Sequence, residues 1–193
     1  MAEAEEIVRL LRAHEEGDPS AFSRVVPLVY DQLRQLARHQ RRRGPQARSL
    51  DTTALVHEAY VKLAGSPGLR IRDRGHLMAV TACAMRQILI GRARARLRMK
   101  RGAGADPLPL DEQRLPVYVE AEQLLDLDRA LTMLRRNDER LAQVFECRYF
   151  AGLGEEETAE VLGVSLRTVQ RGFLRARTWL RAELQGAPAA TEG

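Results

Sequence analysis

Arginine side chains gather in two stretches of this sequence, residues 84–101 and residues 165–181. A guanidinium group stays charged at neutral pH and donates two parallel hydrogen bonds to a phosphate or to the edge of a guanine base. Only Lys62 and Lys100 among the 31 basic residues are lysine, a bias that codon usage in a GC-rich genome would explain equally well. Codon usage does not explain why the charge is concentrated, so the two stretches predict binding to a polyanion.

The net charge of +5 conceals a segregation along the chain. Residues 34–101 hold 17 basic and 3 acidic groups and carry +14, whereas residues 1–33 carry −4 and residues 102–193 carry −5. A basic block of this size is the electrostatic footprint of a protein that binds nucleic acid.

Helical periodicity dominates the sequence, and we expect an all-α protein of two small helical domains. Asp18 and Pro19 form a typical helix start, and Pro27 is expected to kink or break the helix that follows. Residues 102–119 contain three prolines and two glycines and read as a linker. Further helices are expected near 52–63, 75–98, 121–136, 138–150, 155–162 and 166–184. The predicted organisation is a domain over 1–101, the linker 102–119, a domain over 120–185 and a flexible tail over 186–193.

The C-terminal domain carries the pattern of a helix-turn-helix within residues 152–184. Ala159, Gly163 and Val169 have the spacing of the small residue, the turn glycine and the packing residue of that motif, and Ser165 is a good N-cap for its second helix. Buried positions of that helix recur at helical spacing: Leu166, Val169, Phe173, Ala176 and Leu180. Gly172 interrupts the pattern at a cost of about 1 kcal/mol, and the sequence offers no reason for it.

The opposite face of the second helix is basic, as expected of a helix that enters the major groove. Arg167, Gln170 and Arg171 are the candidates for base edges, while Thr168, Arg175 and Arg177 are the candidates for phosphates, with Ser165 at the helix start. The alternative is an ordinary helical hairpin with a solvated basic face.

The N-terminal domain offers two further surfaces. Arginines wrap around the helix over 84–101, and their mutual repulsion calls for a neutralising polyanion, unless this is only an exposed helix end. The helix over 51–63 buries Leu55, Val56, Ala59, Tyr60 and Leu63. Its other side mixes Ala54 and Val61 with charged groups, which suits docking on a partner protein, although an ordinary Glu58–Lys62 pair explains it equally well.

Catalytic patterns are missing from the sequence. The four histidines form no HExxH or HxH motif, no Walker loop or GxSxG occurs, and Cys83 and Cys147 form no CxxC pair. We therefore expect no enzyme, no metal and no cofactor. Neither a membrane span nor a signal peptide is evident, so a cytoplasmic location is expected.

Together the two halves resemble a family: the bacterial sigma factors of the extracytoplasmic-function (ECF) type. The order of features carries the resemblance over residues 5–185, and it is most specific at DTTALVHEAYVKL, HLMAVTACAMRQILIGRARARLR and GLGEEETAEVLGVSLRTVQRGFLRAR. Such proteins are all-α, carry regions two and four of the sigma superfamily, bind core RNA polymerase, direct it to promoters and assist promoter melting.

The resemblance implies a role for each surface. The helix 51–63 would bind the β′ clamp helices through Asp51, His57, Glu58 and Lys62. The helix 75–98 would read and help melt the minus-ten element through Arg86, Gln87, Arg92, Arg94 and Arg96. The helix 166–181 would read the minus-thirty-five element. The β flap and promoter DNA complete the expected partners, and whether an anti-sigma factor binds the chain is left open.

Two features depart from the family pattern. Gly91-Arg92 stands where many relatives carry Asp-His, and no aromatic residue lies between Tyr60 and Tyr118 to stack on an unpaired base. A pocket of backbone, arginine and His76 would have to hold such a base. The competing function is a stand-alone helix-turn-helix regulator that binds DNA without polymerase. The sigma-factor account requires basic helices that face outward and lobes that reach separate stretches of a duplex.

Overall fold

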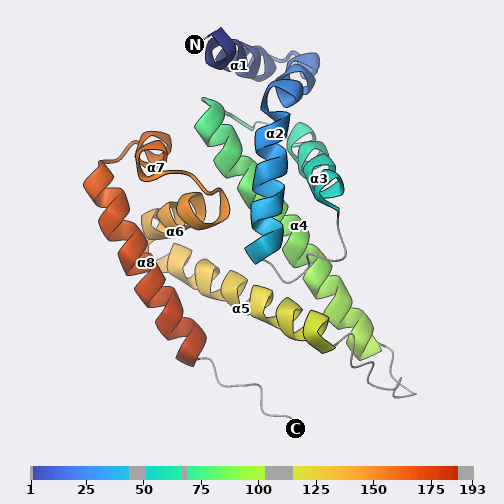
Figure 1. Ribbon diagram of the computed structural model, residues 1–193, viewed down its shortest axis with the longest axis vertical. Coiled ribbons are helices and arrows are strands. Elements are labelled where there is room, and N and C mark those ends of the chain that lie inside the picture. The colour runs from blue at the N-terminus through green and yellow to red at the C-terminus, as the bar shows by residue number, and fades with distance from the viewer. Residues whose placement is uncertain (1, 44–50, 67–68, 103–114, 187–193) are drawn as a thin grey trace.

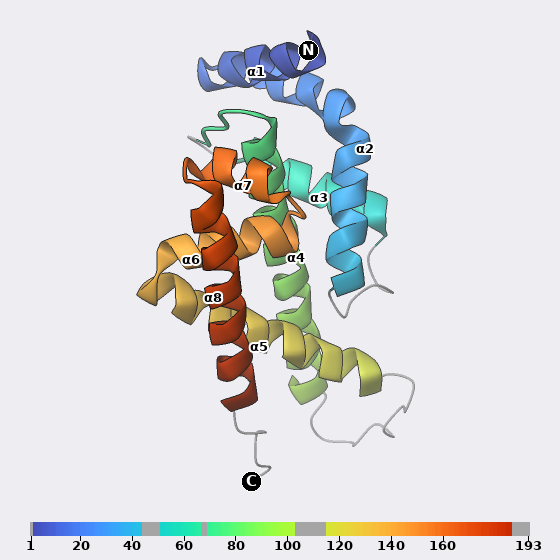
Figure 2. The ribbon, with the colours of Figure 1, turned by 60° about the vertical axis from the view of Figure 1, so that its left-hand side comes forward.

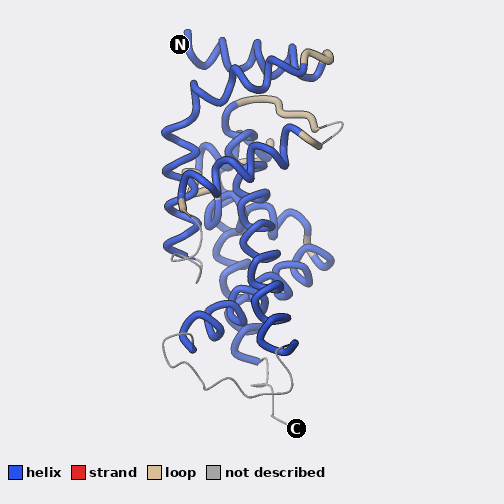
Figure 3. Tube along the Cα trace, turned by 90° about the vertical axis from the view of Figure 1, so that its right-hand side faces the viewer, coloured by secondary structure: helices blue, strands red, loops and turns tan. Residues whose placement is uncertain are grey.

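The computed structural model describes residues 2–43, 51–66, 69–102 and 115–186, and within these ranges the chain is all-helical, as predicted. Figure 3 shows helices joined by short loops, with no strand in the described chain. The elements in chain order are α1 (Ala2–Glu15), α2 (Pro19–Arg43), α3 (Thr52–Ala64), α4 (Arg74–Gly102), α5 (Leu115–Asn137), α6 (Glu139–Phe145), the π-helical turn η1 (Glu146–Phe150), α7 (Glu155–Leu162) and α8 (Leu166–Gly186).

Helices α1 to α4 form what we call the N-terminal lobe, in which α1 crosses the start of α2 (Figure 1). The predicted start of α2 is confirmed, because Asp18 Oδ1 accepts a hydrogen bond from the Ser20 backbone N–H at 2.8 Å. Helix α2 continues through Pro27 without a break, and Figure 2 shows it bending in its N-terminal third. Helix α1 was not predicted from the sequence.

Helix α3 buries the face that the sequence predicts. Leu55 and Ala59 are fully buried, and the Tyr60 ring stacks on Phe22 of α2 at 5.7 Å between centroids. This packing holds α3 in the angle between α2 and α4, so that its opposite face points away from the lobe.

Helices α5 to α8 form the C-terminal lobe, which contains the helix-turn-helix as α7 and α8. Gly163 ends α7 with φ of 63°, the left-handed conformation expected of the turn glycine. Ser165 Oγ accepts from the Thr168 backbone N–H at 3.2 Å, which confirms the predicted N-cap of α8. Val169 and Ala176 are fully buried, but Leu166, predicted to be buried, is 40% exposed, because it stands in the first turn of α8.

Helix α5 begins at Leu115, inside the range predicted as linker. Pro116 lies in its first turn, where a missing backbone N–H costs no intrahelical hydrogen bond. Most of the predicted linker, residues 103–114, and most of the predicted tail, residues 187–193, lie outside the described residues.

The two lobes pack against each other along α4. Figure 1 shows α4 crossing the middle of the molecule with α2 and α3 on one side and the C-terminal lobe on the other. Helix α5 and η1 contact α4 directly, and a single cluster of buried apolar residues includes members from both lobes. In this structure the lobes are therefore closed on each other, and the basic helix α4 lies between them.

Gly172 lies where α8 packs closely against α6, which limits the size of the residue at this position. The residue is buried, and a Cβ at its position would lie 3.5 Å from Leu141 Cδ2 and 3.6 Å from both methyl carbons of Val144. These are ordinary van der Waals distances, so the site has room for one methyl group and for little more.

We expect Gly172→Ala to raise the free energy of unfolding by about 0.5–1 kcal/mol, because it restricts the unfolded chain and fits the available space. Gly172→Leu should lower it by about 1–3 kcal/mol by overfilling the contact with α6. The matched controls are Gly91→Ala and Gly91→Leu in α4, because Gly91 is exposed and a Cβ there would meet nothing within 4 Å. Urea unfolding followed by circular dichroism measures all of them, and equal effects of leucine at both positions would contradict the explanation.

Candidate nucleic-acid interface

The exposed face of α8 carries the arginines predicted to contact DNA. Arg167, Arg171 and Arg175 are exposed, and among the described residues none of their side chains has a hydrogen-bond or ion-pair partner. With Ser165 and Thr168 they line a groove of about 360 Å³ that Arg140 of α6 also borders. An open groove with unpaired guanidinium groups is a suitable surface for phosphates and base edges.

Two other predicted residues on α8 are engaged within the protein. Gln170 Nε2 donates to Glu155 Oε2 of α7 at 2.8 Å, and the Arg177 guanidinium lies 5.8 Å from the centre of the Phe173 ring. Both residues are exposed, so these contacts orient the side chains at the surface without burying them.

Arg148, which the sequence analysis did not single out, contacts both helices of the helix-turn-helix. Arg148 donates a short hydrogen bond to the Leu153 carbonyl oxygen, lies 3.9 Å from Glu155 and sits 5.4 Å from the centre of the Phe173 ring. It thus connects η1, the loop before α7 and α8. At the start of α7, Glu157 Oε2 accepts from the Gly154 backbone N–H at 2.7 Å.

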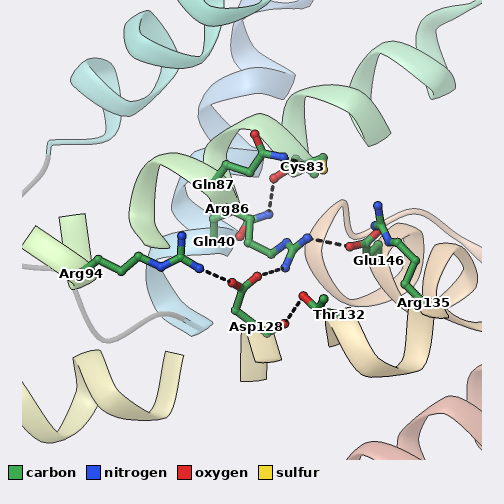
Figure 4. Close-up of polar contacts among 10 residues, drawn as sticks. Gln40, Cys83, Arg86, Gln87, Arg94, Asp128, Thr132, Arg135 and Glu146 are labelled. Atoms are coloured by element: carbon green, nitrogen blue, oxygen red, sulfur yellow. Dashed lines mark hydrogen bonds and ion pairs between the residues drawn. The ribbon is translucent and has the colours of Figure 1, made fainter. Parts of the chain in front are cut away.

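The residues predicted to read DNA on α4 do not share one free surface. Arg86 is only 7% exposed, with Nη1 2.8 Å from Asp128 Oδ1 and Nη2 2.8 Å from Glu146 Oε1 (Figure 4). Arg94 is exposed, but its Nη2 lies 3.1 Å from Asp128 Oδ2. Contact of Arg86 with DNA would therefore require the lobes to separate.

The remaining candidates on α4 lie nearer the surface. Gln87 is exposed and its Nε2 lies 3.9 Å from Cys83 Sγ, while Arg96 is partly exposed. Arg92 forms a short ion pair with Glu58 of α3, so the residue that departs from the family pattern is tied to the helix expected to bind polymerase.

The predicted docking face of α3 is open. His57, Lys62 and Asp51 are exposed, and Val61 between them is 54% exposed. Glu58 pairs with Arg92 of α4 and not with Lys62 one turn away. The face therefore presents an apolar centre flanked by His57 and Lys62, while Glu58 is half withdrawn to its edge.

Comparison with known families decides what kind of protein this is. A family model described as ECF sigma factor matches residues 4–186. This chain belongs to the ECF sigma factor family. Its general role is therefore that of a sigma factor in transcription initiation, which involves binding to RNA polymerase and to DNA, and sigma factors are transcription factors and not enzymes.

A search of curated proteins finds no match to this sigma factor. Among solved structures it is similar to CnrH, described in complex with the cytosolic domain of CnrY, with 22% sequence identity and a TM-score of 0.39. That similarity covers 94% of this chain and 99% of the CnrH chain.

The described part of this sigma factor holds no helix long and apolar enough to cross a bilayer. It also contains no cluster of three or more histidine, cysteine or acidic side chains arranged to hold a metal ion. His76, considered for an unpaired base, is half-buried at the start of α4, where Nδ1 accepts from the Arg72 backbone N–H at 3.2 Å. Burial, and next the Arg72 charge, lower the pKa of His76, so the ring is neutral at pH 7.

The two cysteines of this sigma factor lie in different environments. Cys83 of α4 is partly exposed, whereas Cys147 of η1 is buried. Burial, with a smaller contribution from the neighbouring Glu146 charge, raises the pKa of the Cys147 thiol to about 12. Since the thiolate is the reactive form, Cys147 should be inert in the folded protein.

Iodoacetamide at pH 8 should therefore modify Cys83 at least tenfold faster than Cys147 in the folded protein, with both reacting alike in guanidinium chloride. Mass spectrometry of tryptic peptides measures each site. Equal rates at the two cysteines in the folded protein would show that η1 is not packed as described.

Proposed function

We propose that this ECF sigma factor directs core RNA polymerase to promoters in the bacterial cytoplasm, with α8 reading the minus-thirty-five element, α3 binding the β′ clamp helices and α4 acting at the minus-ten element. The observation that carries the proposal is the helix-turn-helix with its exposed arginine face on α8, where Arg167, Arg171 and Arg175 have no partner among the described residues. Membership of the ECF sigma factor family supports RNA polymerase as a partner. The two lobes would offer separate surfaces for polymerase and for the two promoter elements.

Helix α8 would enter the major groove with its N-terminal half. Arg167, Arg171 and Gln170 are placed for base edges, the last after release from Glu155. Thr168, Arg175 and Arg177 would bind flanking phosphates, and Ser165 would mark the entry of the helix into the groove. Because the turn is held by Gly163 and Arg148, the backbone of this surface needs no rearrangement before it meets DNA, and of the three candidates for base edges only Gln170 has a partner to release.

Helix α3 would dock through Asp51, His57, Val61 and Lys62, with Glu58 at the edge of the contact. A central apolar residue surrounded by polar groups is the usual composition of a protein interface. The β flap would be met by the C-terminal lobe.

Helix α4 would act at the minus-ten element through Arg86, Gln87, Arg92, Arg94 and Arg96. Its described residues include no aromatic side chain, so promoter melting would depend on arginine and backbone contacts to an extruded base. Arg86 and Arg94 would first have to leave their carboxylate partners.

One observation favours a second function, that of a stand-alone DNA-binding regulator. The arginine face of α8 is open, whereas Arg86 of α4 is buried and paired with carboxylates of the C-terminal lobe, so in the closed protein α8 is the more accessible of the two DNA-binding candidates. Gel filtration with core polymerase that lacks other sigma factors separates the two functions. Co-elution and promoter-directed transcripts support the sigma factor, whereas tight specific binding to short duplexes without polymerase supports the regulator.

Lys62→Glu should weaken binding to core polymerase at least tenfold, because it reverses the charge beside Val61 on the docking face. Arg24→Glu, an identical reversal on the exposed side of α2, is the matched control and should bind like the wild type. Fluorescence anisotropy of labelled sigma factor titrated with core polymerase measures both. Equal affinities for the two variants would place the docking face elsewhere.

Arg171→Ala should relax the preference at one upstream base position by about 1–3 kcal/mol if its guanidinium reads a base. Run-off transcription by reconstituted holoenzyme on promoters with randomised upstream elements, followed by sequencing, measures the preference. Arg181→Ala near the end of α8 should leave the pattern intact. A uniform loss across all upstream sequences would instead assign Arg171 to a phosphate.

A further inference from the structure

The groove between α6 and α8 concentrates positive charge. Helix α6 contributes Arg140 to its lining, and α8 contributes Arg167, Arg171 and Arg175. All four residues are exposed, and none of their guanidinium groups has a hydrogen-bond or ion-pair partner within the described part of the chain. Arg140 lies outside the helix-turn-helix, so the DNA-binding role proposed for α8 does not account for it.

Negative charge in the same groove is small and already engaged. Among the described residues that line it, Asp138 has the one carboxylate, and Asp138 Oδ1 accepts a hydrogen bond from the Leu141 backbone N–H at 3.0 Å, which caps α6. Four guanidinium groups therefore share a space of about 360 Å³ with one carboxylate. Their mutual repulsion falls when an anion binds between them.

The opposite flank of α8 has the opposite charge. Helix α7 begins with Glu155, Glu156 and Glu157, and Glu155 Oε2 accepts from Gln170 Nε2 of α8 at 2.8 Å. Helix α8 thus runs between α6, which supplies a cation, and the acidic first turn of α7 (Figure 2). A phosphate group would be attracted to the α6 side and repelled from the α7 side.

A helix in the major groove has a phosphate backbone along each of its flanks, and contacts to those phosphates set its orientation on the duplex. Thr168 and Arg175, the candidates for phosphates, line the groove on the α6 side. Arg140 lines the same groove from α6. A DNA strand that meets Arg175 would therefore lie within reach of Arg140 as well.

We propose that the groove between α6 and α8 binds phosphate groups of one promoter strand, and that Arg140 of α6 is a phosphate contact that holds the duplex against α8. Arg140 and Arg175 would bind this strand from the two walls through charge-assisted hydrogen bonds. The strand beside α7 would receive fewer such contacts, and this asymmetry would fix the orientation of α8 in the major groove. The inference rests on the function proposed for α8.

Arg140→Ala tests the contact, and because the side chain is exposed the variant should keep its helical circular dichroism. Its holoenzyme should bind all upstream sequences more weakly by a similar factor, and the slope of log affinity against log salt should become shallower by about one unit. Arg140→Lys keeps the charge and should restore most of the slope. Arg129→Ala is the matched control, an exposed arginine of α5 that pairs with Asp126 and does not line the groove. Equal slopes for Arg140→Ala and this control would overturn the inference.

Promoter duplexes with single methylphosphonate linkages, which carry no charge, locate the contact. At one or two adjacent positions of one strand, such a linkage should weaken binding of the wild-type holoenzyme and lose most of that effect with Arg140→Ala, because the partner of the phosphate is gone. The Arg129→Ala holoenzyme should give the wild-type pattern. A pattern for Arg140→Ala that matches the wild type at every position would overturn the inference.

Free phosphate compounds offer the same chemistry as the DNA backbone. Inorganic tripolyphosphate titrated into the full chain, measured by calorimetry, distinguishes the two sources. Weak binding that disappears in 0.2 M salt, together with the expected change of slope on DNA, supports the promoter strand. Tight binding that Arg140→Ala abolishes, together with an unchanged slope on DNA, would make the groove a site for a free anion and overturn the inference.

The outcomes also separate this inference from the proposed function. If Arg171→Ala alters the preference at one upstream base while Arg140→Ala leaves the salt slope unchanged, α8 reads DNA and the inference is wrong. If Arg140→Ala lowers the slope while Arg171→Ala leaves every base preference unchanged, the phosphate site stands and the base-reading role of Arg171 is wrong.

Discussion

The arrangement of this molecule depends on how one buried charge is compensated. A guanidinium group removed from water is tolerated only when paired and hydrogen-bonded. The two terminal nitrogens of Arg86 satisfy this condition with Asp128 and Glu146, which fixes α4 against both α5 and η1. Through η1 and Arg148 the same contact is continuous with the loop before α7 and with α8. This arginine is thus one of the contacts, together with the shared apolar cluster, that set the orientation of the helix-turn-helix relative to the N-terminal lobe.

Arginine ion pairs also link α4 to α3 and to the C-terminal lobe. Arg92 ties the edge of α3, the helix proposed to bind polymerase, to α4, and Arg94 ties α4 to the C-terminal lobe. These arginine contacts couple the surface proposed for polymerase to the surface proposed for DNA. Under the proposed function, the arginines of α4 would have two sets of anionic partners, carboxylates within the protein and phosphates of the promoter.

Local sequence patterns predicted a large part of this structure. The capping role of Asp18, the turn at Gly163, the cap at Ser165 and the buried face of α3 each depend on residues within a few positions of one another. The burial of Arg86 could not be predicted, because its partners lie 42 and 60 residues away. The contacts of Gly172 and Arg148 could not be predicted for the same reason, because they join helices that meet only in the folded chain. The sequence alone does not distinguish an arginine that forms a buried ion pair from one that is free to bind DNA.

The central claim is that Arg86 of α4 can reach DNA only when the lobes separate, and a distance between the lobes tests it most directly. Fluorophores introduced through unnatural amino acids at Ser23 on α2 and Thr178 on α8, both exposed, would report that distance by energy transfer. The account predicts one high-transfer population for the free protein and one low-transfer population for the complex with polymerase and promoter. The same high transfer in both states would contradict it.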